Sequence, residues 1–83
     1  MNVHFHPHAL ARLAERGATK AEVAAAIAEG ERFPAKFGRT GFRRNFAFDD
    51  SWRSRKYATK QVEVFAIEEE GAWLVITVIA RYY

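Results

Sequence analysis

Three histidines, His4, His6 and His8, fall within five residues near the start of the chain. His4 and His6 stand two positions apart, so on a strand they would point to the same face, where two imidazoles can bind zinc. Pro7 interrupts that strand and sends His8 in a different direction, and no nearby aspartate or cysteine completes a ligand set. We therefore expect no bound metal and no other cofactor.

His8 also begins a second pattern, with Arg12, Glu15 and Arg16 on or near one face of a helix. The start of a helix carries partial positive charge and Arg12 is one turn away, and both effects disfavour the imidazolium form. A neutral His8 could accept a proton as a general base. The alternative is a surface helix with an arginine–glutamate pair, which needs no function.

The segment from Lys36 to Lys60 carries eight basic and two acidic side chains, whereas the whole chain has a net charge of only +3. Aromatic residues are interleaved with the basic ones, a pattern typical of segments that bind polyanions and stack on unpaired bases. An acidic protein partner, or a basic loop that is simply solvated, would give the same composition. The candidate nucleic-acid-binding residues are Arg39, Arg43, Trp52, Arg53, Arg55, Lys56, Tyr57 and Lys60.

Two arginines occupy unusual positions on predicted strands. Arg44 breaks a run of phenylalanines, and Arg81 ends a strand rich in valine and isoleucine. Such an arginine either extends past its apolar neighbours to solvent or points into a functional site. Because the planar guanidinium suits phosphate recognition, both arginines are candidates for stabilising charge on a phosphate.

The composition indicates one small domain spanning residues 1–83. The absence of cysteine excludes disulfides, thiolate zinc sites and cysteine nucleophiles, and it fits a reducing compartment. The start of the chain has no signal-peptide pattern, and the longest apolar run, residues 72–80, is too short to span a bilayer as a helix. We expect a cytoplasmic protein with no membrane partner.

Periodicity and capping residues predict the elements that must position these side chains. In chain order they are a strand over 3–5, a helix over 7–16, a second helix capped by Thr19 and ended by Gly30, a strand over 42–48, a loop over 49–59, and strands over 61–68 and 73–81. The last strand is apolar on both faces, so we expect it to be the central one. The predicted fold class is α+β, with a helical hairpin on one face of an antiparallel sheet of at least three strands and the other face open to a partner.

Two stretches give a resemblance to a known family. HALARLAERG at 8–17, followed by TKAEVAAAIAEG at 19–30, resembles the opening of a family of small bacterial domains of unknown function that is similar to the RelE/ParE and BrnT-like toxins of toxin–antitoxin systems. The hairpin VEVFAIEEEGAWLVITVI at 62–79 resembles the closing strands of that family, with Thr77 where a threonine commonly ends the last strand. The resemblance covers His6 to Ile79.

This resemblance implies a RelE-like fold whose open sheet face binds RNA or the ribosome, and an antitoxin protein as a partner. Relatives of the RelE type cleave RNA without metal, whereas ParE-type relatives inhibit DNA gyrase. The family motif falls on His8, Arg12 and Arg16, and we add Arg44, Lys60 and Arg81 from their charge and strand positions. We therefore expect a metal-independent ribonuclease or an RNA-binding protein. A noncatalytic nucleic-acid-binding module and a protein-interaction module that inhibits a target enzyme are the alternatives.

Overall fold

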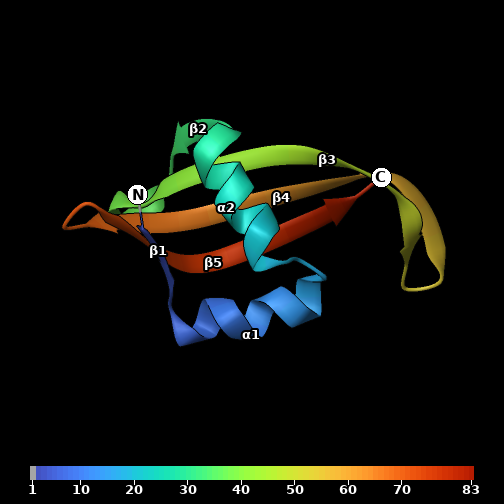
Figure 1. Ribbon diagram of the computed structural model, residues 1–83, viewed down its shortest axis with the longest axis horizontal. Coiled ribbons are helices and arrows are strands. Elements are labelled where there is room, and N and C mark those ends of the chain that lie inside the picture. Colours follow the sequence, from blue (N-terminus) through green and yellow to red (C-terminus); the bar gives the residue numbers. More distant parts are fainter. Residues whose placement is uncertain (1) are drawn as a thin grey trace.

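The computed structural model describes residues 2–83 and has an α+β fold with two helices and a mixed sheet of five strands (Figure 1). The spatial order of the strands is β1-β5-β4-β3-β2, and every neighbouring pair is antiparallel except β1 and β5, which are parallel. The elements in chain order are β1 (Asn2–Phe5), α1 (Pro7–Arg16), α2 (Lys20–Glu29), β2 (Glu31–Pro34), the 3-10 turn η1 (Lys36–Gly38), β3 (Thr40–Trp52), β4 (Arg55–Glu69) and β5 (Ala72–Tyr82).

Local capping residues set the limits of both helices. α1 begins at Pro7, whose missing N–H costs nothing in the first turn, and the His6 Nδ1 atom accepts from the backbone N–H of His8 at 3.1 Å. Gly17 ends α1 in the left-handed conformation, with φ of 70°. α2 begins with a complete capping box between Thr19 and Glu22. The predictions for the extents of both helices are confirmed.

The hydrophobic core lies between the two helices and one face of the sheet. Ala9 and Leu13 of α1 and Val23 and Ala26 of α2 join a single buried cluster with inward-facing residues of the strands. Figure 1 shows α2 crossing the sheet over β3 and β4 while α1 runs beside β5. Side chains that alternate with the core positions, Arg43 and Glu63 among them, point to the opposite face of the sheet, which we call the open face.

The predicted loop over 49–59 is wrong, because this segment forms a long β-hairpin. β3 and β4 continue past the body of the sheet, with Ser51 paired to Lys56 and Trp52 paired to Arg55. The two residues of the turn, Arg53 and Ser54, both have positive φ, as in a type I′ turn, but without the usual asparagine and glycine. Most residues of this hairpin are exposed and polar. Their polar composition led to the prediction of a loop.

Two further predictions about the sheet need correction. Strand β2 was missed, because it has only four residues, is mostly exposed and ends in Pro34, as suits an edge strand. The segment 73–81 forms most of β5, but the central strand is β4, with β3 and β5 on its two sides. The second apolar face of β5, with Thr77 and Ile79 half-buried, belongs to the open face of the sheet and not to a second buried layer.

The hairpin bends back toward α1. The strand register shifts between Ala47 and Asp50, and a bulge of this kind bends the strand that carries it. Figure 1 shows the resulting arm, residues 49–58, curving away from the sheet. Trp52 packs against Gly17, where an added Cβ would lie 2.6 Å from the indole ring, so the close approach of the arm to the end of α1 requires glycine there.

Candidate nucleic-acid interface

Side chains from the sheet cap the C-terminal end of α1. The last carbonyls of a helix have no partner within the helix and attract donors and positive charge. A guanidinium nitrogen of Arg53 donates to the carbonyl of Glu15 at 3.1 Å, and the Tyr82 hydroxyl donates to the carbonyl of Arg16 at 2.6 Å. Burial raises the pKa of the Tyr82 hydroxyl above its ordinary value. These caps join residues far apart in sequence and fix the arm against α1.

The caps bring two predicted groups of basic residues to one end of the molecule. Arg12 and Arg16 belong to α1, and the hydrogen bond from Arg53 to the Glu15 carbonyl brings the tip of the arm, which also carries Arg55 and Lys56, to the end of the same helix. We call the surface formed by Arg12, Arg16, Arg53, Arg55 and Lys56 the basic end. Four of the five, all except Arg12, form no ion pair within residues 2–83, so their charges remain free to attract an anion.

Arg12 is paired with Glu15, as the helical spacing predicted. The hydrogen bond from Arg12, followed by its charge, lowers the pKa of the Glu15 carboxyl below its ordinary value. Asp49 and Asp50 lie on the same arm, and Asp49 borders a shallow depression with Lys56 and Tyr57. The basic end therefore includes carboxylates, but only Glu15 among them is engaged by a basic side chain.

The aromatic residues of the arm pack against each other. Trp52 stacks on Tyr82 with ring centroids 5.1 Å apart and planes within 14°, and the Arg53 guanidinium lies 5.2 Å from the indole centroid. Tyr57 contacts the same tyrosine in a tilted arrangement, with centroids 5.7 Å apart. Trp52 therefore packs against Tyr82, Arg53 and Gly17, and its role as a base-stacking platform stays a prediction.

Lys60 is also a packing residue. It is only 4% exposed, and its Nζ atom lies 2.8 Å from a carboxylate oxygen of Glu22 and donates to the carbonyl of Gly17. A buried ammonium needs partners of this kind because it has lost its hydration. The Lys60 ammonium is therefore already engaged within the protein, and its contact with nucleic acid stays a prediction.

The five predicted catalytic residues do not meet at one point. Arg44 points to the helix side of the sheet and pairs with Glu29 of α2 at 3.3 Å. Arg81 points to the open face and pairs with Glu63 at 3.3 Å. The two guanidinium groups are thus on opposite faces of the sheet, where they cannot stabilise the same phosphate. His8, Arg12 and Arg16, in contrast, share one exposed helix.

His8 is exposed at the start of α1, about 12 Å along the helix axis from Arg16. Its backbone N–H donates to Nδ1 of His6, and its side chain forms no hydrogen bond or ion pair with other groups of residues 2–83. No three histidine, aspartate or glutamate side chains within residues 2–83 lie close enough together to hold a metal ion. The role of His8 as a general base stays a prediction.

The remaining candidates lie away from the basic end. On the open face, Arg43 donates to Glu63 and to Glu31, each at 2.8 Å, and the bond to Glu63 is the main cause of a raised arginine pKa. Because the Arg43 guanidinium already binds two carboxylates, its positive charge is compensated and attracts a phosphate only weakly. Arg39 lies just after η1, at the opposite end of β3 from the arm.

No family model, curated protein or solved structure matches this chain. Within residues 2–83, no helix is long and apolar enough to cross a membrane.

Proposed function

We propose that this chain binds RNA through the basic end. The observation that supports it is the hydrogen bond from Arg53 to the Glu15 carbonyl, which brings the basic tip of the arm to the C-terminal end of α1. Phosphate contacts from several unpaired cations supply most of the affinity of sequence-independent nucleic-acid binding. The basic end has four such cations, whereas Arg43, Arg44, Lys60 and Arg81 are each paired with a carboxylate.

The geometry of the arm favours RNA over the major groove of DNA. A free two-stranded ribbon can enter that groove. Here the tip of the ribbon is attached to α1 through Arg53, and the Trp52 ring is packed inward. The attached tip therefore cannot insert into a groove, and it suits contact with the phosphate backbone at the surface of a nucleic acid.

The test compares two double charge reversals of equal size. Arg55→Glu with Lys56→Glu reverses two cations of the basic end that form no ion pair within residues 2–83, and Lys20→Glu with Arg32→Glu makes the same change in charge on other elements. Binding of a labelled single-stranded RNA, and of duplex DNA of the same sequence, is measured by fluorescence anisotropy, with thermal melts to confirm folding.

We expect the Arg55/Lys56 variant to lose at least tenfold in RNA affinity and the Lys20/Arg32 variant to lose much less. An equal loss in both variants would show that only net charge matters. Retention of full affinity by the Arg55/Lys56 variant, or a clear preference for duplex DNA, would reject the proposal.

A second candidate function is metal-independent RNA cleavage with His8 as the general base. It is favoured by the exposure of His8 on the same helix as Arg12 and Arg16. In this reaction the ribose 2′-oxygen loses its proton to His8 and attacks the adjacent phosphorus, and the 5′-oxygen leaves with a proton. The products are a 2′,3′-cyclic phosphate and a free 5′-hydroxyl, and cationic side chains stabilise the extra charge on the phosphate oxygens.

Under this proposal the chain is a RelE-like toxin that acts on RNA or the ribosome and is neutralised by an antitoxin protein. The α+β arrangement and the residues at 8–17 support this assignment. Its test is growth of a bacterial host during induced expression, with the His8→Ala variant as the control. Inhibition of growth without any RNA binding or cleavage would instead favour a protein-interaction module that inhibits an enzyme.

A further inference from the structure

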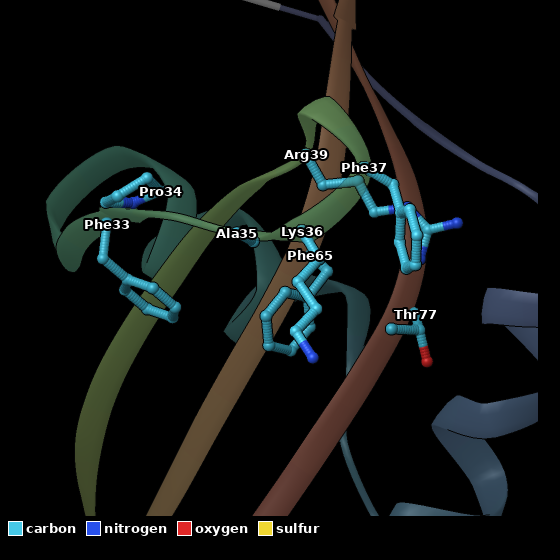
Figure 2. Close-up of a pocket in the computed structure, with 8 residues that line it drawn as sticks. All are labelled: Phe33, Pro34, Ala35, Lys36, Phe37, Arg39, Phe65 and Thr77. Carbon is cyan, nitrogen blue, oxygen red and sulfur yellow. The ribbon is translucent and has the colours of Figure 1, made fainter.

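A cavity of about 610 Å³ lies on the open face, at the opposite end of β3 from the arm. Figure 2 shows η1 arching across the sheet close to β4 and β5, with Phe65 on β4 and Thr77 on β5. The cavity is lined by Phe33, Pro34, Ala35, Lys36, Phe37, Arg39, Phe65 and Thr77. Its volume is within the range of pockets that bind small molecules.

The walls of the cavity are aromatic. Phe33 and Phe65 meet edge to face, with ring centroids 6.1 Å apart and planes at 85°. The Phe33 ring sits directly over Gly41, where an added Cβ would lie 2.3 Å from it, so the ring is held close to the sheet. Because an aromatic ring prefers edge-to-face or offset contact with its neighbours, a planar apolar group is the natural occupant of such a wall.

The charged residues of the cavity are two cations, Lys36 and Arg39, and the Arg39 guanidinium lies 5.8 Å from the centroid of the Phe37 ring. Lys36 and Arg39 form no ion pair within residues 2–83, and no acidic side chain lines the cavity. The Nε atom of Arg39 is buried and has no hydrogen-bond partner among the described residues. Buried donors are nearly always satisfied, and Nε is one of the two nitrogens that a carboxylate or phosphate uses in a bidentate contact.

Phe37 lies at the rim of the cavity and has a strained backbone conformation. It is 84% exposed, and its φ of 61° lies in the left-handed region, which is rare for a bulky side chain. Residues in such conformations cluster at ligand-binding segments. Hydrogen bonds between Ala35 and Arg39 and between Arg39 and Lys36 hold the turn that presents it.

We propose that this cavity binds a small aromatic oxyanion, a planar apolar body that carries one carboxylate, sulfonate or phosphate group. The aromatic body packs against Phe33, Phe65 and Phe37, and the oxyanion accepts hydrogen bonds from Arg39 with Lys36 nearby. This site is separate from the basic end and does not depend on the proposed RNA binding.

The test uses two fluorescent probes of similar shape. Anilinonaphthalenesulfonate has the aromatic body and the anion, and N-phenylnaphthylamine has the aromatic body alone. We expect the wild type to bind the anionic probe at least tenfold more tightly. Arg39→Gln should lower the affinity for the anionic probe by about tenfold or more, the usual loss for a charge-assisted hydrogen bond, and leave the neutral probe unchanged.

Matched variants assign the probe to this cavity. Phe37→Ala should weaken both probes, and Leu10→Ala, which removes an exposed apolar side chain from α1, should weaken neither. Naphthoate should displace the bound sulfonate and acetate should not. Equal binding of the two probes, equal effects of Phe37→Ala and Leu10→Ala, or displacement by single-stranded RNA but not by naphthoate would each overturn the proposal.

Discussion

The Nζ atom of Lys60 lies 2.8 Å from Oε1 of Glu22, the same carboxylate oxygen that accepts the Thr19 N–H at the start of α2. The central strand of the sheet is thereby joined to a helix cap, and through the Gly17 carbonyl to the end of α1. The Lys60 side chain is almost fully buried and Glu22 is partly buried, so the pair is shielded from solvent. Lys60 thus holds together the two helices and the strand that they cover.

Replacement of Lys60 should destabilise the fold. Lys60→Ala leaves Glu22 without its partner in a shielded site and opens a space under the helix junction, so the free energy of unfolding should fall by about 3–5 kcal/mol. Chemical denaturation measures the change, with Lys20→Ala on the exposed start of α2 as the control, expected within about 0.5 kcal/mol of wild type. Equal stability of the two variants would contradict the buried pair.

The Arg12–Glu15 pair should appear in the acid titration. The pKa of Glu15 is lowered in the folded chain, so its contribution to stability is present above about pH 4.3, the ordinary glutamate value, and is lost as the pH falls through the folded pKa. Arg12→Gln should return the pKa of Glu15 toward the ordinary value, as measured by NMR of the side-chain carboxyl. Arg16→Gln, a weaker influence on Glu15, should move it much less.

RNA affinity should depend on salt through the basic end. Neutralising Arg55 and Lys56 to glutamine should reduce the slope of log affinity against log salt concentration by roughly 1.4, the value for two lost phosphate contacts on a single strand. Anisotropy titrations at four salt concentrations give the slope. A slope that is unchanged while affinity falls would mean that these two side chains act by shape and not by charge.

His8 can be tested against a second exposed histidine. If His8 is the general base, His8→Ala should lower the rate of RNA cleavage in EDTA by about 10²–10⁴-fold, and His4→Ala should leave the rate near wild type. Both residues are exposed, so the free energy of unfolding of both variants should lie within about 0.5 kcal/mol of the wild-type value. Cleavage that persists in His8→Ala, or that is absent from the wild type, would remove the catalytic assignment.

The turn of the arm offers a stabilising substitution. Ser54 has φ of 70°, in the region that glycine enters without steric cost. Ser54→Gly should therefore raise the free energy of unfolding by about 0.5–1 kcal/mol, as measured by thermal melting. Gly38→Ser, which places a side chain at another φ of 70°, should have the opposite effect.

The sequence by itself determined the local elements. Pro7 and Gly17 delimit α1 and the Thr19–Glu22 box begins α2, because caps act on backbone groups within a few residues. Alternation along residues 42–48 likewise predicted the body of β3, and the apolar segment 73–81 predicted that of β5. The α+β class followed from the order of these elements.

Only the tertiary structure decided which charges are available. Arg43 meets Glu63 across twenty residues, Lys60 meets Glu22 across thirty-eight, and Arg44 and Arg81 turn to opposite faces of the sheet. Composition could not distinguish these four cations, which are paired, from the arginines of the arm, because net charge carries no information on strand register or burial. Pairing across the sheet withdrew some cations into ion pairs, and the bend of the arm brought its basic tip to the end of α1. Lys36 and Arg39 form no ion pair within residues 2–83 and lie at the opposite end of β3.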